Sequence, residues 1–355
     1  MKIRLLQYLA CPACQEANFA LEVKHKEQHT IYHSHFTGLE RGLDGLRFED
    51  REEEDIEEGV LHCNNCGQHY PILKGIPRML LDRQEEDSVS QAQSGHRFTR
   101  FDPAQDLSVW ETHFLELNDP LRKEDFIGKR VLDLGCGYGR HSYFAARYGA
   151  EVIAIDSSED AVLATKENTK NLKHVHIIQA DGAHLPLREQ SIDRGYCFGV
   201  LHHVKNSAEI LASINRVISS GGSLSIWVYG PRQGLTLAVN NALRGVTTNM
   251  NHEELLSLSQ NIARGLRVVS HTPYLVLHKV PVVKGIVSHL PVHDHYRWPF
   301  DIVVADVYDR LKFPIYSWFK KEELEKWYID HGYLKFAARR IVRNNETFSA
   351  FGVKR

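Results

Sequence analysis

The stretch VLDLGCGYGR, residues 131–140, decides the fold, because it takes the chain from an apolar strand directly into a helix. Gly135, Gly137 and Gly139 let the backbone turn tightly at this point and approach a ligand closely. A glycine loop alone also fits a nicotinamide dinucleotide site. Arg140 stands where the dinucleotide fingerprint has its third glycine, so the GxGxG spacing argues against that ligand.

Strand and helix patterns alternate on both sides of this loop. The strand patterns are KRVLDLG (129–135), EVIAIDSS (151–158), HVHIIQAD (174–181), SIDRGYCFGVL (191–201) and SLSIWVYG (223–230). The helix patterns are RHSYFAARYG (140–149), SEDAVLATKENTKNL (158–172) and NSAEILASINRVISSGG (206–222). Such alternation predicts an α/β fold, a doubly wound and mostly parallel sheet with helices on both faces.

The end of the chain returns to this pattern. A helix is predicted over 320–333, followed by two strands over 334–345 and 347–355 that meet at a short turn containing Asn344 and Asn345. We expect this hairpin to bring the sheet to seven strands and to add one antiparallel strand at its edge.

Length and composition set the limits of the interpretation. The chain has 355 residues, which suggests two domains, and a formal net charge of −2. No bulk positive field therefore attracts nucleic acid or anionic lipid. No apolar run is long enough for a membrane span, and the N-terminus does not read as a signal peptide. We expect a cytoplasmic protein with reduced thiols.

Four of the six cysteines form two CxxC pairs, Cys11 with Cys14 and Cys63 with Cys66. Two such knuckles together supply four thiolates, which is a closed tetrahedral zinc site. A site without an open position is structural rather than catalytic. The alternatives are one redox-active CxxC pair or coincidence.

Composition divides the chain further. We predict a zinc-binding α+β module over 1–82, a linker over 83–95 and the α/β domain over 96–355. Within the module, residues 40–58 hold ten acidic and three basic side chains and are interpreted as a solvated, mobile loop. Residues 231–300 interrupt the alternation and are predicted to form a helical insertion that roofs the substrate pocket.

The segments LLQYLACPACQ (5–15) and CNNCGQHYPILKGIPRMLL (63–81) resemble the small zinc-binding domain that activates tRNA, rRNA and release-factor methyltransferases. In those complexes the small domain is a docking and solubilising platform and not the catalyst. The resemblance therefore implies a platform fused in cis to the domain that follows. The acidic insertion at 40–58 departs from the small relatives.

Residues 96–230 and 301–355 resemble class I S-adenosylmethionine-dependent methyltransferases, which have a Rossmann-like sheet. The resemblance implies a role for each matching position. The methionine part would be lined by Asp133, Gly135, Gly137 and Gly139, with Phe198 and Gly199 under its tail. The ribose hydroxyls would be held by Asp156 and the adenine by Ser157, Ser158, Asp181, Gly182 and Ala183.

The stretch from GVLHHV (199–204) to RVISSGG (216–222) resembles the ubiquinone-biosynthesis-type group of these enzymes. It implies a small-molecule, lipid or glycan-precursor acceptor. His202 and His203 are candidate general bases, with His203 favoured, since a histidine titrates near neutral pH. The alternative is that both histidines only pack.

The end of the insertion, HLPVHDHYRWPF (289–300), is the candidate acceptor-binding segment. His293, His295, Tyr296 and Arg297 would contact an anionic, planar or glycosidic substrate, although scattered surface histidines are the simpler interpretation. An RNA or translation-factor methyltransferase and a cofactor-binding scaffold without turnover stay open as other functions. The oligomeric state stays open as well.

Overall fold

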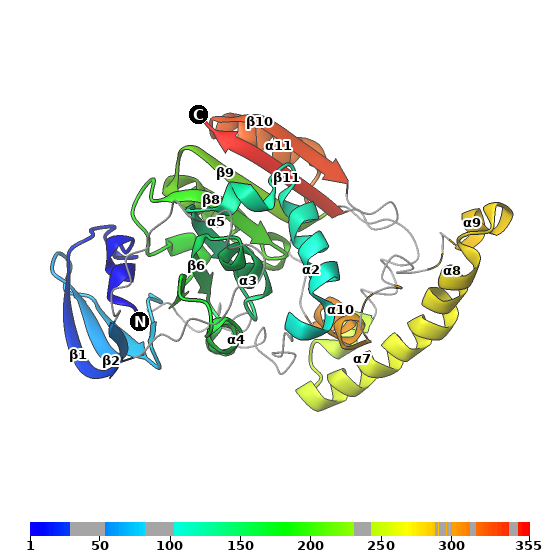
Figure 1. Ribbon diagram of the computed structural model, residues 1–355, viewed down its shortest axis with the longest axis horizontal. Coiled ribbons are helices and arrows are strands. Elements are labelled where there is room, and N and C mark those ends of the chain that lie inside the picture. The colour runs from blue at the N-terminus through cyan, green and yellow to red at the C-terminus, as the bar shows by residue number, and fades with distance from the viewer. Residues whose placement is uncertain are drawn as a thin grey trace.

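The computed structural model describes residues 1–28, 54–81, 103–230, 243–287, 290, 296, 298, 300–312, 317–340 and 347–355. These residues form a small antiparallel sheet near the N-terminus, a seven-stranded sheet in the middle, and a helical extension at the far end (Figure 1). The predicted linker and most of the acidic segment lie outside the described residues.

The small module is a four-stranded antiparallel sheet with one short 3-10 helix. Its order is β1-β2-β3-β4. Its elements are η1 (Ile3–Gln7), β1 (Phe19–Gln28), β2 (Glu54–Cys63), β3 (His69–Leu73) and β4 (Ile76–Pro77). The prediction of a solvated loop over 40–58 is wrong at its end, because residues 54–58 belong to β2. Ile56 explains this pairing, since its side chain is fully buried in the module.

The large sheet has the order β10-β11-β9-β8-β5-β6-β7. Its strands are β5 (Arg130–Leu134), β6 (Glu151–Asp156), β7 (Val175–Gln179), β8 (Ile192–Phe198), β9 (Ile218–Tyr229), β10 (Tyr333–Arg340) and β11 (Thr347–Lys354). β5 to β9 are mutually parallel, whereas β11 runs antiparallel to both β9 and β10. The predicted doubly wound, mostly parallel α/β fold is confirmed.

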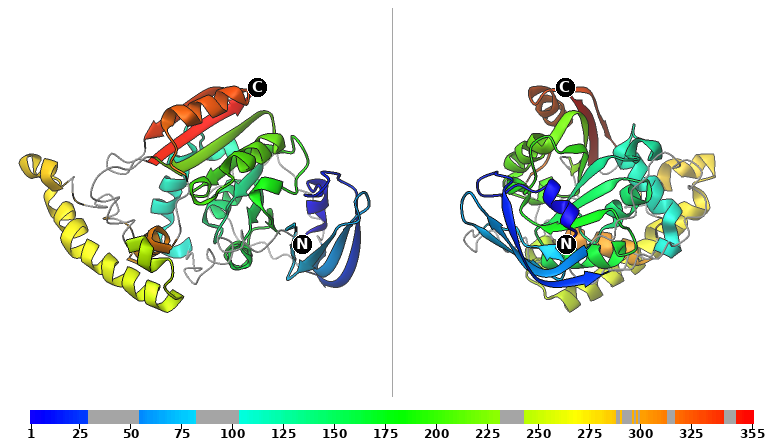
Figure 2. Two further views of the ribbon diagram at one scale, coloured as in Figure 1. Left: turned by 180° about the vertical axis from the view of Figure 1, so that it is seen from behind. Right: turned by 60° about the vertical axis from the view of Figure 1, so that its left-hand side comes forward.

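Helices cover both faces of this sheet (Figure 2). They are α2 (Pro103–Asn118), α3 (Arg140–Arg147), α4 (Glu159–Thr169), α5 (Ser207–Val217) and α11 (Lys321–Asp330). Successive side chains of β5 point to opposite faces of the sheet. Val131 packs in a cluster with α2 and α3 on one face, and Leu132 packs in a cluster with α5 and α11 on the other. The second cluster continues into the zinc-binding module through Leu5 and Leu9.

Two boundaries differ from the sequence prediction. The helix predicted over 206–222 ends at Val217, and β9 begins at Ile218, because Gly221 takes a φ of +74° that a helix does not accommodate. The antiparallel strand β11 is not at the sheet edge. It lies between β9 and β10, where Ala350 and Phe351 are buried, and β10 forms the edge.

The described part of the insertion is helical. α7 (His252–Leu266), the π-helical turn Arg267–His271 and α8 (Thr272–Leu277) follow one another without a break, and α9 (Pro281–Val287) follows a short turn. The first half of α7 packs on α10 (Phe300–Lys312), with Leu255 against Val303 and Val307 in a separate buried cluster. Over the described ranges, no helix is both long and apolar enough to cross a bilayer.

Candidate functional site

The predicted cofactor residues gather at one edge of the large sheet. From β5 the chain continues to β6 and β7 on one side and then crosses to β8 and β9 on the other. The strand order therefore reverses between β5 and β8. In open α/β sheets, ligands bind outside the carboxyl ends of the strands at this reversal. Residues 133–139, 156–158, 181–183 and 198–199 all lie at these carboxyl ends.

The glycine loop is held in place by β6 and α4. The backbone amides of Gly135 and Cys136 donate to the carbonyl of Ile155 at 2.8 and 3.1 Å. A side chain at Gly135 is excluded, because its Cβ would lie 2.1 Å from Cγ2 of Val200. From α4, the Thr165 hydroxyl donates to the Gly137 carbonyl at 2.9 Å.

Asp156 links the end of β6 to the glycine loop. Its Oδ2 accepts from the backbone amide of Gly137 at 3.0 Å, and its Oδ1 accepts from that of Ser158 at 2.9 Å. Removal from water raises the pKa of this carboxyl, and the backbone amides partly offset the rise. Each oxygen still has a lone pair for a further donor, as a bidentate contact to two hydroxyls requires.

Asp133 lies deeper than Asp156 and is 2% exposed. Its Oδ2 accepts from the hydroxyl of Ser142 at 2.6 Å, so the carboxyl joins β5 to α3. Burial raises the pKa of Asp133 to about 7, and the charge of Asp156 adds to this rise. Because both carboxyls have a raised pKa, a cationic ligand would stabilise both ionised forms.

The remaining cofactor candidates lie on the neighbouring strand ends. Asp181 caps a short 3-10 turn, and its Oδ1 accepts from the amide of Ala183 at 3.0 Å. Phe198 stacks on Tyr196 with ring centroids 5.1 Å apart, and His141 of α3 meets Phe198 edge-on at 5.2 Å. Burial lowers the pKa of His141 well below its usual value, which keeps this ring neutral.

The two candidate bases differ in their surroundings. His202 is fully buried and stacks on Tyr229, with 3.9 Å between ring centroids. Its Nδ1 accepts from the backbone amide of Tyr229 at 3.4 Å. His203 is half-buried, and its ring lies 4.2 Å from that of His202. This arrangement favours a packing role for His202.

Only Tyr296 of the predicted acceptor-binding residues can be placed; His293, His295 and Arg297 lie outside the described residues. The Tyr296 ring packs on Tyr274 of α8 at 5.1 Å. The next described residue, Trp298, lies 5.7 Å from Trp110 of α2.

Trp110 in turn lies beside the glycine loop. The guanidinium of Arg140, the first residue of α3, sits 3.9 Å above the Trp110 ring, which is a cation–π contact. Trp298, near the end of the insertion, is therefore connected to the loop through its tilted ring contact with Trp110.

The four predicted zinc ligands converge. Their sulfur atoms all lie within 4.8 Å of one another, and the Cys11–Cys66 and Cys14–Cys63 pairs are each 3.6 Å apart. A tetrahedral site with Zn–S bonds of about 2.3 Å has sulfurs roughly 3.8 Å apart. The donor set therefore fits a zinc ion with no open position. The Tyr70 hydroxyl donates to Cys11 Sγ at 3.0 Å and would orient that ligand.

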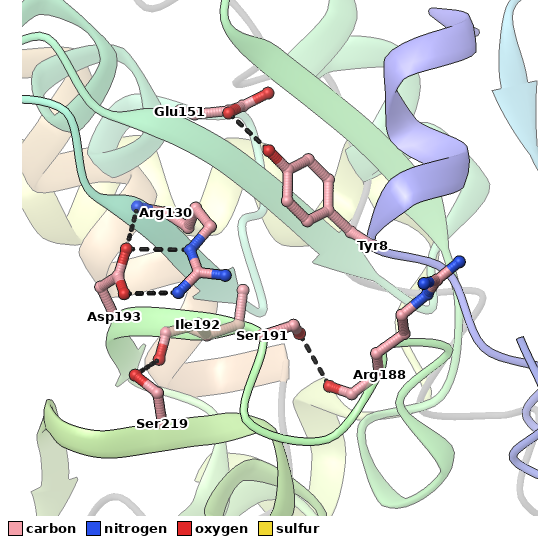
Figure 3. A network of polar contacts seen from close by, with 8 residues as sticks. All are labelled: Tyr8, Arg130, Glu151, Arg188, Ser191, Ile192, Asp193 and Ser219. Carbon is pink, nitrogen blue, oxygen red and sulfur yellow. Dashed lines mark hydrogen bonds and ion pairs between the residues drawn. The ribbon is translucent and has the colours of Figure 1, made fainter.

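Buried polar groups join the zinc module to the large domain, and Figure 3 shows one of these contacts, between Tyr8 and Glu151. The Tyr8 hydroxyl donates to Oε2 of Glu151 at 2.7 Å, and His176 Nε2 donates to Oε1 of the same carboxylate at 3.0 Å. Burial opposes the charge on Glu151, but these hydrogen bonds and the nearby Arg4 lower its pKa to about 2. The module is thus docked through an ionised carboxylate.

Backbone pairing extends this contact. The amide of Met79 donates to the carbonyl of Gln179 at 2.8 Å, so the segment after β4 lies alongside the end of β7 in parallel. The Arg78 guanidinium reaches the Gln179 side chain at 2.8 Å and Glu159 of α4 at 3.1 Å.

Sequence reasoning did not identify these docking residues, nor Thr165 and Ser142 behind the glycine loop. Apart from Ser142, which is nine positions from Asp133, each is an ordinary polar residue whose partner is distant in the chain. The only sequence signal was indirect: a module expected to dock in cis requires a surface on which to dock.

Two family models match the chain. Residues 132–226 match the model described as a methyltransferase domain, and residues 2–75 match that of Trm112p-like protein. The chain therefore carries a Trm112p-like domain followed by a methyltransferase domain.

Among similar proteins, an uncharacterized 37.1 kDa protein in a transposon of Streptomyces fradiae is 39% identical over 27% of this chain and 29% of its own length. The mitochondrial ubiquinone biosynthesis O-methyltransferase of Schizosaccharomyces pombe is 33% identical over 28% of this chain and 37% of its own. The chain thus spans about a third of these relatives. A solved structure, phosphoethanolamine N-methyltransferase 2 of Haemonchus contortus, is 13% identical over 81% of this chain and 62% of its own, with a TM-score of 0.45.

Proposed function

We propose that this protein is an S-adenosylmethionine-dependent methyltransferase whose own N-terminal zinc module supports the cofactor-binding edge of the sheet. One observation carries the proposal. Asp156 ends β6 at the reversal of strand order and already bonds to the backbone of the glycine loop. A carboxylate held in this way beside a close-approaching backbone suits a ribose with two free hydroxyls.

The residues at the strand ends fit this cofactor. Asp156 would take the ribose hydroxyls, and Asp181 with Ser157, Gly182 and Ala183 would take the adenine. The carboxyls of Asp133 and Asp156 are removed from water, so they favour a positively charged ligand. The cofactor carries two positive groups, an ammonium and a sulfonium. When bound, S-adenosylmethionine supplies a methyl group that is already activated on sulfur.

The protein's own task is then to orient an acceptor and to remove its proton. His203 is the proposed general base, because its half-buried ring lies just beyond β8 and remains accessible. His202 is proposed as a positioning residue that holds His203 through ring packing at 4.2 Å. Acceptor binding remains the proposed role of His293, His295, Tyr296 and Arg297.

A small-molecule, lipid or glycan-precursor acceptor is favoured. The support is the segment after β8, which resembles that of ubiquinone-biosynthesis-type enzymes, together with a similar relative named as a ubiquinone biosynthesis O-methyltransferase. An RNA or protein acceptor is the alternative, and the Trm112p-like domain favours it. A scaffold that binds the cofactor without turnover is the second alternative. We further propose domain limits of 1–82 and 96–355 and a cytoplasmic location.

The test is transfer of a labelled methyl group. The full chain is incubated with methyl-labelled S-adenosylmethionine and with lysate separated into metabolite and lipid, RNA, and protein fractions. Label in the metabolite and lipid fraction supports the preferred acceptor class. Ribonuclease-sensitive or protease-sensitive label selects the alternative acceptors instead. Absence of label from every fraction, despite measurable cofactor binding, would support the second alternative, a scaffold that binds the cofactor without turnover.

A further inference from the structure

The insertion contains a long helical arm, defined here as residues 252–287. α7, the π-helical turn and α8 form one unbroken helix from His252 to Leu277. At 1.5 Å per residue, such a helix is roughly 40 Å long. Its first half packs on α10, whereas its second half and α9 extend away from the body of the protein (Figures 1 and 2).

The outward face of the arm changes character along its length. Near the body its exposed residues are polar: Glu253, Glu254, Ser257 and Asn261. Beyond Leu266 the same face becomes apolar, with Val268 at 72% exposure and Val276 at 64%. Six of the twelve exposed large apolar side chains in the described part of the chain lie here: Val268, Val269, Leu275, Val276, Val280 and Ile286.

Such a concentration is unusual, because isolated apolar residues are normal on a surface but a contiguous patch marks an interaction site. None of these six side chains belongs to the buried clusters formed by the described residues. The patch therefore has no packing role within the part of the protein that the structure describes.

Beyond Glu254, the charged side chains of the arm are all basic. From Leu255 to Val287 there is no Asp or Glu, whereas Arg264, Arg267, Lys279 and Lys284 are all basic. Lys279 and Lys284 are exposed among the apolar residues of the outer half. This local positive charge is hidden in the near-neutral net charge of the whole chain.

We propose that the outer half of the arm binds an anionic lipid membrane and lies in its interface without spanning it. Helices with an apolar face and basic flanks bury that face at the boundary between head groups and acyl chains. Each basic residue near an anionic leaflet adds electrostatic attraction. In the described part of the arm, both features occur together on its outer half, which comprises the end of the continuous helix, the following turn and α9.

A second copy of the chain is a poorer occupant of the same face. In a two-fold dimer the patch would meet itself, so the cations of one outer half would face those of the other, and the outer half contains no acidic residue that could pair with them. An anionic bilayer has the complementary charge and also accepts the aliphatic side chains.

Membrane binding at this position would orient the methyltransferase domain. Arg267 of the arm donates to the carbonyls of Tyr296 and Trp298. Trp298 in turn lies against Trp110 beside the glycine loop. The cofactor-binding edge of the sheet and the membrane-binding face are thus connected by direct contacts.

The test is cosedimentation of the full chain with phosphatidylcholine vesicles, with and without phosphatidylglycerol. We expect binding to the anionic vesicles that weakens as salt rises. The variant Val268→Asn/Val276→Asn should bind about tenfold or more weakly, since it removes buried apolar area. The variant Lys279→Glu/Lys284→Glu should lose a similar factor at low salt and less at high salt.

A matched control changes the same outward face near the body. Ser257→Asn/Asn261→Ser should bind vesicles as the unaltered chain does. Thermal unfolding and sedimentation of each variant without lipid check that fold and oligomeric state are kept. Equal binding by all variants would overturn the proposal. So would absence of binding to any vesicle, or a self-association that the valine variant abolishes.

Discussion

The Lys166 ammonium of α4 lies 2.9 Å from Oε1 of Glu57 in β2, so an ion pair joins helix α4 to the zinc module. Its neighbour Thr165 reaches in another direction and donates to the Gly137 carbonyl of the glycine loop. Two consecutive residues thus connect the module and the glycine loop through one helix. This connection gives the module a physical route by which to support cofactor binding.

Replacing Thr165 by valine tests the second half of this connection. Thr165→Val removes the hydroxyl that holds Gly137 while keeping the branched shape, and a lost hydrogen bond is worth about 1 kcal/mol. Affinity for S-adenosylmethionine should therefore fall roughly fivefold in equilibrium binding. Thr165→Ser keeps the hydroxyl and should bind nearly as the unaltered chain does. Equal affinities of the two variants would contradict the role given to this hydroxyl.

Zinc content tests the metal site. The purified chain should hold about one zinc ion, and Cys63→Ser should lose it, because a tetrahedral site with three thiolates binds far more weakly. The midpoint of thermal unfolding should fall, since structural zinc binding is folding free energy.

The matched change Gln68→Ser, at an exposed position on the same knuckle, should alter neither zinc content nor unfolding. An unchanged zinc content in Cys63→Ser would contradict the assignment of these four cysteines as a zinc site.

The docking carboxylate predicts an acid-dependent stability. The pKa of Glu151 is about 2 in the folded protein, below its ordinary value near 4.5. A carboxyl with a lowered folded pKa stabilises the protein above its unfolded pKa and loses that contribution as pH falls toward the folded one. Stability should thus decline between about pH 4.5 and 2.

Glu151→Gln removes the ionisable group, so its unfolding free energy should be lower at neutral pH and less dependent on pH in this range. Tyr8→Phe should cost about 1–2 kcal/mol, because it removes a hydrogen bond to a charged group. Chemical denaturation at a series of pH values measures both. A Glu151→Gln profile as steep as that of the unaltered chain would contradict the assignment.

His203 is expected to matter for transfer and not for cofactor binding. His203→Gln should lower kcat by about a hundredfold, a typical contribution of a general base, and leave S-adenosylmethionine affinity unchanged. If kcat persisted in this variant, the histidine would have only a packing role.

The sequence predicted the large sheet well, because its signals are local. β5, β6 and β7 are short apolar runs with Asp133, Asp156 and Asp181 within two residues of their carboxyl ends, and parallel strands bring those ends to one edge. The four cysteines were equally clear, since two CxxC pairs supply one complete ligand set. The converging sulfur atoms agree with that reading.

The docking surface and the arm could not be predicted in the same way. Glu151 and Tyr8 are 143 positions apart, and nothing in either local pattern indicates that they meet. On the arm, Val268 and Val276 read as ordinary core positions of a helix. Whether an apolar face is covered depends on tertiary packing. The near-neutral net charge of the whole chain also does not reveal the local basic charge of the arm.

Calorimetric titration of the full chain with S-adenosylmethionine tests the central claim most directly. The test variant is Asp156→Ala, and the matched control is Asp160→Ala, which also loses a carboxylate but in α4. Hydrogen bonds to a charged group are worth about 1.5–3 kcal/mol, so Asp156→Ala should bind ten to a hundredfold more weakly. Asp160→Ala, an exposed position, should bind as the unaltered chain does. Unchanged affinity in Asp156→Ala, or no binding by the unaltered chain, would contradict the account.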